Sequence, residues 1–466
     1  MSSRSPRVGL LPLFLNLYNE VLPEEDANGI TAFADLIRRE YGKRGVEVIP
    51  SAACCEAEQF SATVHAFEAA DVDAIITLHL AYSPSLESID ALVATDLPLI
   101  LLDTTPDSGF GFEQAKERIL FNHGIHGVQD LCNLLIRRGK SFLLEAGHWK
   151  KSDVLDRTLS ALKGCRIAKA LKNARVGIVG EPFKGMGDFL VPFDVLKREI
   201  GMEVIPAISE EIAAWMPATD APDVRKEIEA DRTRFATGEY TDESLLNTEA
   251  AGLGLRRWME EESLSACTLN FSDITGAPGL PVVPFLEVSK AMARGIGYGG
   301  EGDVLTAAFC GALMQVVPET TFTEMFCPDW DGNRIFMSHM GELNVDTMAG
   351  TPVLEQRPYP FSAADEPIIA SGCLKPGTAW FLNIAPGRDD SFSLVAAPVK
   401  VCNSGGREKI DGGIRGWIQP PVPVAEFLKQ YSLAGGTHHG VLCYGIDEHL
   451  VEAFAKTMNW KYRSIQ

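Results

Sequence analysis

Short apolar runs alternate with amphipathic stretches in the first third of the chain. The runs RVGLLPLFL, VEVIP, DAIITLHLA and LPLILLDT are interpreted as buried strands, because short continuous apolar runs are typical of strands that are covered on both faces. Between the first two runs, the stretch ITAFADLIRREYGKRG carries Ala32, Leu36 and Tyr41 near helical spacing. This alternation of strands and helices predicts a parallel sheet with helices on both faces.

The pattern repeats once and then changes. A second unit begins at ARVGIVGEPFKGMGDF, where a strand runs into a glycine-rich turn, and an acidic stretch at 209–249 is predicted to form surface helices. From about Thr320 the segments are short, turn-bounded and rich in β formers, which predicts an antiparallel sheet or barrel. We therefore expect an α/β protein with two doubly wound parallel-sheet domains, 1–173 and 174–318, and a β-rich, barrel-like C-terminal domain, 319–466.

Composition narrows the classes of partner. A formal net charge of -21 without a sizeable basic patch disfavours nucleic acid and membrane surfaces. The start MSSRSPRVGL leads directly into a strand-like segment, and no apolar run approaches the roughly 20 residues of a membrane span, so a cytoplasmic location is expected. Ten scattered cysteines without a C-x-x-C motif favour reduced thiols over a zinc knuckle or a disulfide framework.

The segment GIGYGGEGDVLTAAFCG places Gly295, Gly297 and Gly300 in the G-x-G-x-x-G spacing of a dinucleotide loop. Such a loop needs a strand before its first glycine, whereas the preceding FLEVSKAMAR is predicted to be helical. Glu301 and Asp303 then stand at the start of the next helix, where acidic residues often cap the helix or balance its dipole. The other glycine-rich turn, GEPFKGMGDF, lacks the K-[ST] ending of a P-loop and is interpreted as a ligand loop at a strand end.

Further candidate ligands follow Glu301 along the chain: Glu324 in TFTEMF, His339 in FMSHMGE, and the pair His438 and His439 in AGGTHHG. Two carboxylates and two imidazoles can form one divalent-metal site, and this mixed set suits Mn²⁺, Co²⁺ or Fe²⁺ better than a thiolate-dominated zinc site does. Because adjacent residues normally point apart, only one histidine of the pair is expected to face the ion. The histidines expected to be structural are His65, His79, His123 and His449.

The segments GYGGEGDVLTAA, TEMF, SHMGE and GGTHHG resemble, in order and spacing, the four metal-site segments of the L-arabinose isomerase family, within the wider L-fucose/L-arabinose isomerase fold. Upstream, DAIITLHLAYSP, NHGIHGVQD and LEAGHW are similar to further segments of that family. The resemblance implies a homo-oligomer, a hexamer or a trimer, with active sites at subunit interfaces. It implies Mn²⁺ as the cofactor, with Co²⁺ or Fe²⁺ as alternatives, and as metal ligands Glu301, Glu324, His339 and His439.

The resemblance also implies a set of sugar contacts. His438 would lie beside the ion, and His126 would approach the sugar from a neighbouring subunit. The remaining pocket positions are Leu17, Tyr18, Tyr82, Met186 and Phe271. The family's Q-x-L-Y-G motif reads LNLYN here, so Leu15 replaces an amide that could hydrogen-bond a sugar hydroxyl. We therefore expect the substrate to be a pentose, a deoxyhexose or a modified sugar, and not necessarily arabinose.

The implied activity is aldose-ketose isomerisation through an enediolate, with Glu301 and Glu324 as the acid/base pair. Two alternatives remain open at this point. The chain could be a non-catalytic sugar-binding or regulatory protein, because its doubly wound N-terminal portion is similar to sugar-binding clefts. It could also be a lyase that uses the same metal-enediolate chemistry. The two glutamates and two histidines favour an enzyme, because a binding protein has no use for a proton shuttle around an ion.

Overall fold

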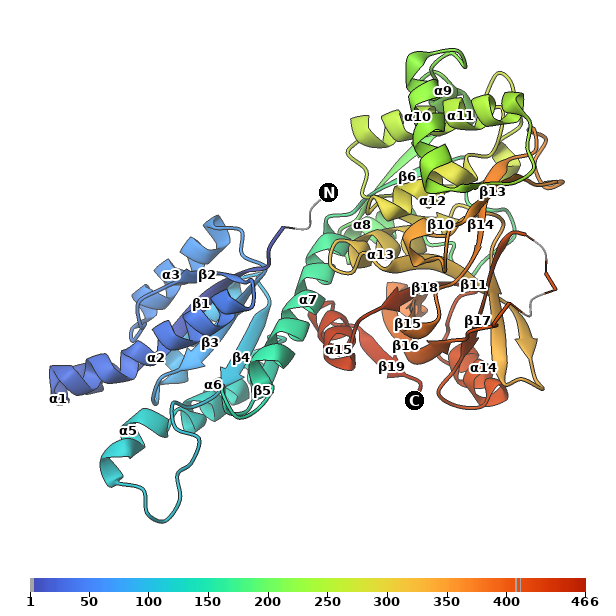
Figure 1. The fold of residues 1–466 in the computed structure, drawn as a ribbon. Helices are drawn as coiled ribbons and strands as arrows, with labels where there is room; N and C mark the ends of the chain where they lie inside the picture. The colour runs from blue at the N-terminus through green and yellow to red at the C-terminus, as the bar shows by residue number, and fades with distance from the viewer. Residues whose placement is uncertain (1–3, 407–408, 411) are drawn as a thin grey trace. The chain divides into compact units, whose positions relative to one another are not determined.

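The computed structural model describes residues 4–406, 409–410 and 412–466. Two compact units are present (Figure 1): one comprises the chain up to Lys169 with Asp447–Asn459, and the other comprises Ala170–Ile446 with Trp460–Gln466. The predicted α/β class is confirmed, because parallel sheets flanked by helices precede a large β-rich sheet. The division into three domains stays a prediction. Within the described ranges, none of the helices combines the length and apolar character that crossing a bilayer requires.

The unit that begins the chain is built on a parallel sheet with the order β2-β1-β3-β4-β5. This order places β1 beside β3, which is the switch point of a doubly wound sheet. The four predicted apolar runs form β1 to β4 of its five strands, and β3 is buried along its whole length. The strands are β1 (Arg7–Leu13), β2 (Glu47–Pro50), β3 (Ala74–His79), β4 (Leu99–Asp103) and β5 (Leu143–Ala146).

Helices cover both faces of this sheet and bury two apolar clusters against it. In α2 the buried residues Ile30, Phe33, Ile37 and Tyr41 recur every three or four positions, as one helix face requires. The helices are α1 (Asn16–Val21), α2 (Glu24–Lys43), α3 (Ala57–Ala69), α4 (Ser85–Ala94), α5 (Ile119–Asn122), α6 (Ile125–Arg137), α7 (Val154–Lys172) and α15 (Glu448–Thr457), with the 3-10 turn η1 (Lys116–Arg118).

The other unit begins with a second parallel sheet, ordered β10-β9-β6-β7. Its strands are β6 (Arg175–Val179), β7 (Glu203–Ala207), β9 (Ala266–Leu269) and β10 (Gly297–Gly300). Its helices are α8 (Phe193–Glu199), α9 (Ser209–Ala213), α10 (Pro222–Arg234), α11 (Asp242–Glu261), α12 (Phe285–Ala293) and α13 (Val304–Met314), with the turn η2 (Phe271–Asp273). Helix α13 is buried on every side, because the sheet and the β-rich region both pack on it.

The prediction that the acidic stretch forms only surface helices is wrong for the inner faces of α10 and α11. Asp231 and Glu249 are buried there, and the ammonium of Lys290 on α12 lies 2.7 Å and 3.0 Å from their carboxylates. Glu227 lies 2.8 Å from the same ammonium. A carboxylate can be buried when an opposite charge lies beside it. The acidic sequence of α10 and α11 does not show that Lys290 of α12 supplies this charge, and the prediction therefore placed both helices at the surface.

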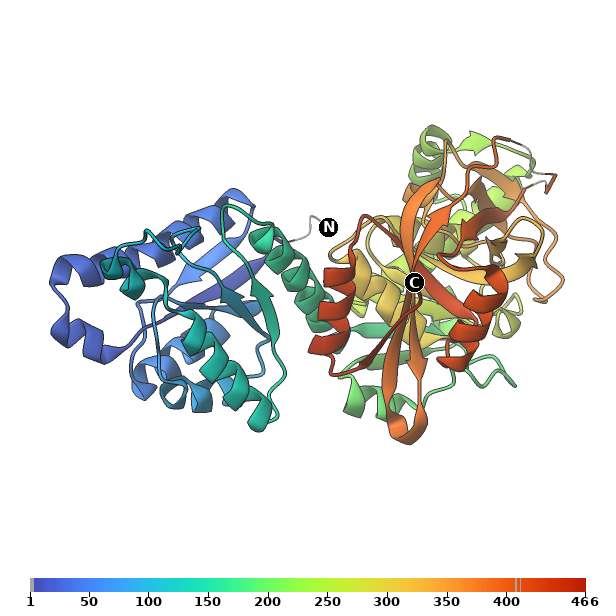
Figure 2. The same cartoon turned by 90° about the horizontal axis from the view of Figure 1, so that it is seen from below.

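The predicted barrel is confirmed in the β-rich region. Strands pair antiparallel in the order β16-β15-β18-β11-β12-β17, and β16 also pairs with β17, which closes the ring. The long β15-β16 hairpin of this ring is seen in Figure 2. The strands are β11 (Thr320–Asp329), β12 (Arg334–Ser338), β15 (Gly377–Pro386), β16 (Phe392–Val401), β17 (Ile414–Gln419) and β18 (His439–Tyr444).

Shorter strands extend the ring at two places, partly by parallel pairing. They are β8 (Ala236–Thr237), β13 (Val353–Gln356), β14 (Ile368–Cys373) and β19 (Lys461–Ser464), and the region also holds α14 (Val424–Leu433), η3 (Val345–Thr347) and η4 (Arg388–Asp390). The sheet is therefore mixed, although the closed ring itself is antiparallel.

Candidate metal and sugar site

The glycine segment forms a strand, which was not predicted from the sequence. Helix α12 does precede it, but Gly297–Gly300 is β10 and leads directly into α13. An added Cβ would lie 2.2 Å from the Gly311 nitrogen of α13 at Gly297, and 2.5 Å from the His339 ring at Gly300. The glycines lie in the strand, before the turn, and they allow a helix and an imidazole to approach closely. This placement differs from a phosphate loop, in which the glycines follow the strand.

The turn after β10 directs Glu301 into the site. Glu301 has a φ of 60°, a left-handed conformation that is uncommon for a residue with a side chain. Two hydrogen bonds hold the turn: the Phe183 N–H donates to the Glu301 carbonyl at 2.9 Å, and the Gly302 N–H donates to Thr268 Oγ1 at 3.0 Å. Strain of this kind persists where the surroundings hold it, often at functional sites. As predicted for a helix start, Asp303 caps α13 by accepting from the Thr306 N–H at 2.9 Å.

The barrel supplies the other three candidate ligands at one level. Glu324 of β11 pairs in register with Ser338 of β12 and with His439 of β18. His339 follows Ser338 directly, so antiparallel pairing brings segments distant in sequence to one end of the ring. Because Glu301 enters from the β10-α13 turn, the barrel and the second parallel sheet both contribute to the cluster.

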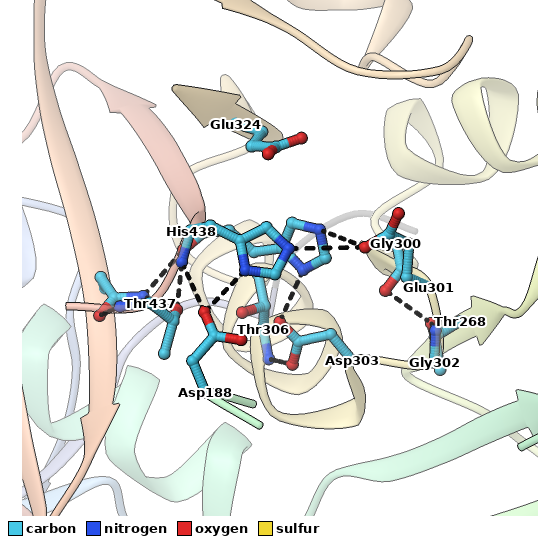
Figure 3. Close-up of polar contacts among 12 residues, drawn as sticks. Asp188, Thr268, Gly300, Glu301, Gly302, Asp303, Thr306, Glu324, Thr437 and His438 are labelled. Carbon is cyan, nitrogen blue, oxygen red and sulfur yellow. Dashed lines mark hydrogen bonds and ion pairs between the residues drawn. The ribbon is translucent and has the colours of Figure 1, made fainter. Parts of the chain in front are cut away.

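The four predicted ligands come together. The His439 Nε2 atom lies 3.6 Å from a Glu301 carboxylate oxygen, and the His339 Nε2 atom lies 3.9 Å from a Glu324 carboxylate oxygen. One ligand atom from each of Glu324, His339 and His439 lies within 4.8 Å of the others, and Glu301, His438 and His439 form a second such group. In Figure 3, Glu301 lies to the right of the His438 ring and Glu324 lies above it.

In both His339 and His439, one ring nitrogen lies against a carboxylate and the other has no hydrogen-bond partner among the described residues. The Nδ1 atom of His339 lies 2.8 Å from a Glu342 oxygen, and that of His439 lies 3.0 Å from an Asp303 oxygen. The Nε2 atoms of both rings are buried and have no hydrogen-bond partner among the described residues. A buried unpaired nitrogen is costly, and a carboxylate on the far side of an imidazole is typical of metal-binding histidines. These residues therefore fit a divalent ion.

The two glutamates differ electrostatically. Burial disfavours ionisation of Glu301, but the hydrogen bond with His438 and the nearby His439 and His339 rings outweigh it and lower the pKa of Glu301. Burial raises the pKa of Glu324, and the same imidazoles only partly offset this effect. Two carboxylates whose pKa values are pushed in opposite directions are typical of acid/base pairs.

His438 lies beside the cluster, contrary to the expectation that adjacent histidines point apart. Its ring centroid is 4.1 Å from that of His439, and its Nε2 atom lies 3.5 Å from a Glu301 oxygen. Its Nδ1 atom lies 2.7 Å from an Asp188 oxygen. The two rings converge because β18 begins only at His439, which leaves His438 outside the pleat of the strand. Burial disfavours the charged ring, but hydrogen bonds to Glu301 and Asp188 outweigh it and raise the pKa of His438 to about 9.

Four of the predicted sugar contacts lie in the unit that begins the chain. The ring of Tyr82 stacks on that of His126 with centroids 4.7 Å apart, and the Tyr18 hydroxyl lies 2.8 Å from the His123 Nε2 atom. Leu17 is exposed on α1. His123, which was expected to be structural, therefore contacts Tyr18, one of the residues predicted to bind the sugar.

The other three predicted contacts, His438, Phe271 and Met186, lie in the unit that holds the metal-ligand candidates. Phe271 packs on Phe183 with ring centroids 5.5 Å apart, and the Met186 N–H donates to the Phe183 carbonyl at 3.3 Å. The turn after β6 therefore connects both residues to Glu301, whose carbonyl accepts from Phe183.

Comparison with known proteins agrees with this geometry. Residues 198–319 match the model of the L-arabinose isomerase central domain, and residues 319–461 match that of the L-arabinose isomerase C-terminal domain. The L-arabinose isomerase of a Nocardioides species is 26% identical over 392 residues, which cover 79% of this chain and 76% of that protein. L-arabinose isomerase 1 of Bacillus licheniformis is 27% identical over 411 residues, with the same two coverages.

The chain is a divergent member of the L-arabinose isomerase family. Solved structures similar to this chain include a periplasmic solute-binding protein of an ABC transporter from Actinobacillus succinogenes with bound D-allose. The two chains are 16% identical, and the aligned region covers 67% of this chain and 91% of the binding protein. Its TM-score of 0.17 is too low to bear on the fold or the ligand of this family member.

Three residues of this site were not predicted from the sequence. Glu342 and Asp188 hold imidazoles, and the Tyr298 hydroxyl donates to Glu342 at 2.8 Å. Glu342 had a local signal, because it stands three residues after His339 in SHMGE. Asp188 and Tyr298 had none, since their partners lie far away along the chain.

Proposed function

We propose that this protein is a metal-dependent aldose-ketose isomerase that acts on a pentose, a deoxyhexose or a modified sugar. The observation that supports the proposal most strongly is that the buried Nε2 atoms of His339 and His439 have no hydrogen-bond partner among the described residues and lie near Glu324 and Glu301. Curated relatives named L-arabinose isomerase support the reaction class. A non-catalytic sugar-binding protein would have no use for this donor set.

In this proposal the divalent ion, Mn²⁺ in the first instance, is held by Glu301, Glu324, His339 and His439. When bound, such an ion lowers the cost of the negative charge that develops on the O1 and O2 oxygens of an enediolate. Asp303 and Glu342 keep the two imidazole rings in place through their Nδ1 atoms. The ring orientation is thus set before any ligand arrives, which reduces the reorganisation needed on binding.

The protein's own groups move the proton. Isomerisation transfers a proton between C1 and C2, so one group must accept it from one carbon and return it to the other. Glu301 and Glu324 form this acid/base pair, and each carboxylate lies within 4 Å of an imidazole nitrogen of the cluster, beside which the sugar carbons would lie. We assign to His438, whose side chain is 30% exposed and lies 3.5 Å from Glu301, the contact with a sugar hydroxyl.

The sugar is proposed to differ from arabinose. Leu15 is half-buried at the start of α1 and offers no hydrogen-bonding side chain where the resemblance to the family motif implies a glutamine. A sugar hydroxyl at this position would lose a partner, and a deoxy or alkylated position would lose nothing.

We also propose that the protein forms a homo-oligomer, a trimer or a hexamer, in which His126 and Tyr82 of one subunit contact the sugar of another. We propose a cytoplasmic location for this oligomer.

The test is solvent-hydrogen exchange. The purified protein, loaded with Mn²⁺, is incubated in D₂O with a panel of aldoses and ketoses, and deuterium at C1 or C2 is measured together with the product formed. We expect deuterium and an aldose-ketose pair for at least one sugar. Carbon-carbon or carbon-oxygen cleavage would identify a lyase instead, and absence of exchange in a protein shown to hold its metal would favour a binding protein.

The matched variants are Glu301→Gln and Glu319→Gln. The first removes half of the acid/base pair and should lower the exchange rate by at least tenfold, since lost acid/base catalysis typically costs about 10²- to 10⁴-fold. The second changes an exposed glutamate that pairs only with Lys375 among the described residues, and should leave the rate unchanged. More than about a tenth of the wild-type rate in Glu301→Gln, with its fold intact, would contradict the proposed role.

A further inference from the structure

The loop at 181–189 after β6 is attached to the metal site at several points, although it contributes none of the four metal ligands. The Phe183 N–H donates to the Glu301 carbonyl at 2.9 Å, and the Asn270 side chain donates to the Glu181 carbonyl at 2.7 Å. At the loop's other end, the Phe189 ring stacks on His439 with centroids 5.3 Å apart and planes 16° apart. The loop therefore has a defined position relative to the cluster.

Asp188 makes two contacts with one residue. A single carboxylate oxygen accepts from the His438 backbone N–H at 2.9 Å and lies 2.7 Å from the His438 Nδ1 atom (Figure 3). Two bonds to one oxygen fix both the backbone and the ring of His438. The ring is thereby oriented with its other nitrogen, Nε2, 3.5 Å from the Glu301 carboxylate.

Three imidazoles of the site each have a carboxylate partner, but His438 differs from the other two. The rings of His339 and His439 are buried and their Nε2 atoms have no partner within the described chain, as a metal ligand requires. The side chain of His438 remains 30% exposed, and its Nε2 atom already faces a carboxylate. This exposure suits a group that meets a substrate oxygen arriving from solvent.

We propose that Asp188 is a positioning residue of this site: it holds His438 so that the Nε2 atom is presented to a sugar oxygen beside Glu301. The inference rests on the proposed isomerase function and adds to it a carboxylate of the GEPFKGMGDF loop, outside the four metal-site segments. Asp188 acts through His438 and contacts no reacting atom itself.

The substitution that tests this role is Asp188→Asn. The oxygen of an asparagine can still accept from the backbone N–H and face the ring of His438, but the substitution removes the negative charge and so weakens both charge-assisted hydrogen bonds. We expect kcat to fall by about tenfold or more, in the range reported for residues that orient site histidines, while the Kd for Mn²⁺ stays within about threefold. Asp194→Asn, the same change at an exposed position of α8, should alter neither quantity.

A double-mutant cycle with His438→Gln separates positioning from a general structural role. If Asp188 acts through His438, Asp188→Asn lowers kcat in the wild-type background and has no further effect in the His438→Gln background. The same cycle is measured by urea unfolding of the metal-free protein, where the two substitutions should also be non-additive. This second measurement tests whether the two side chains are coupled even if His438→Gln has no measurable turnover, and the kcat comparison tests positioning.

Three outcomes would overturn the inference about Asp188: equal kcat in Asp188→Asn and Asp194→Asn, the same loss of kcat with and without His438, or additive effects on unfolding. A wild-type protein that exchanges hydrogen with no sugar of the panel would overturn the isomerase function, and positioning for that reaction with it. An active wild type with an unaffected Asp188→Asn variant would overturn the Asp188 assignment alone.

Discussion

At the scale of single residues, the site depends on where small and charged side chains are placed. Gly300 allows the His339 ring to approach the strand, and Glu301 takes a left-handed turn that other residues hold in place. The sequence could predict that Asp303 starts a helix, since helix starts have a local pattern. It could not predict the contact between Asp188 and His438, because a contact across 250 positions leaves no mark in either local pattern.

A methyl group at Gly300 should disturb metal binding. The added Cβ of Gly300→Ala would lie 2.5 Å from the His339 Cε1 atom, so the ring must move. Because His339 is a proposed metal ligand, moving its ring should weaken Mn²⁺ binding by about tenfold or more, which is comparable to the loss of a residue that orients a ligand. Isothermal titration calorimetry measures the Kd for Mn²⁺. Gly42→Ala, where no atom lies within 4 Å of the new Cβ, is the control, and equal Mn²⁺ affinity in the two variants would refute the expectation.

At the scale of elements, the sequence predicted regular strands better than unusual ones. The apolar runs of β1, β3 and β4 and the turn-bounded segments of the barrel have recognisable patterns, and all became strands. Strand β10 was missed because its sequence, GYGG, has a single β former and takes its conformation from pairing with β9. The inner faces of α10 and α11 were misjudged because their charges are balanced from α12.

Removing the buried ammonium of α12 should destabilise the fold. Lys290→Met leaves Asp231 and Glu249 buried without their counter-charge, which typically costs about 3–5 kcal/mol. The free energy of unfolding in urea measures this loss. Lys429→Met, an exposed lysine of α14, should change that free energy by no more than about 0.5 kcal/mol. A small effect at Lys290 would show that the cluster tolerates the loss of its cation.

The same network predicts a dependence on pH. Burial disfavours the Glu227 carboxylate, but the hydrogen bond from Arg256 and the charge of Lys290 outweigh it and lower its pKa from 4.5 to about 2. A depressed pKa contributes stability above the unfolded-state pKa, and that contribution is lost as the pH falls toward about 2. The difference in unfolding free energy between wild type and Glu227→Gln should be full at pH 7 and should shrink below about pH 4.5. A difference that grows on acidification would contradict this assignment.

At the scale of the whole molecule, the chain returns to its first unit near the C-terminus. Helix α15 packs on α7 so closely that a Cβ at Gly164 would lie 2.6 Å from the Leu450 carbonyl. The order of elements predicted α/β units followed by a barrel, which the structure has. It could not predict this return, because the apolar face of α15 would suit any neighbouring surface.

The central claim is that four residues from the second parallel sheet and the barrel bind one divalent ion. Titration of the metal-free protein with Mn²⁺, in parallel with His339→Gln, His439→Gln and the exposed control His65→Gln, tests it most directly. We predict one ion per chain for wild type and His65→Gln, and loss of that binding in the other two variants, with the fold of each verified by circular dichroism. Unchanged binding in His339→Gln and His439→Gln, or no binding by the wild type, would contradict the account.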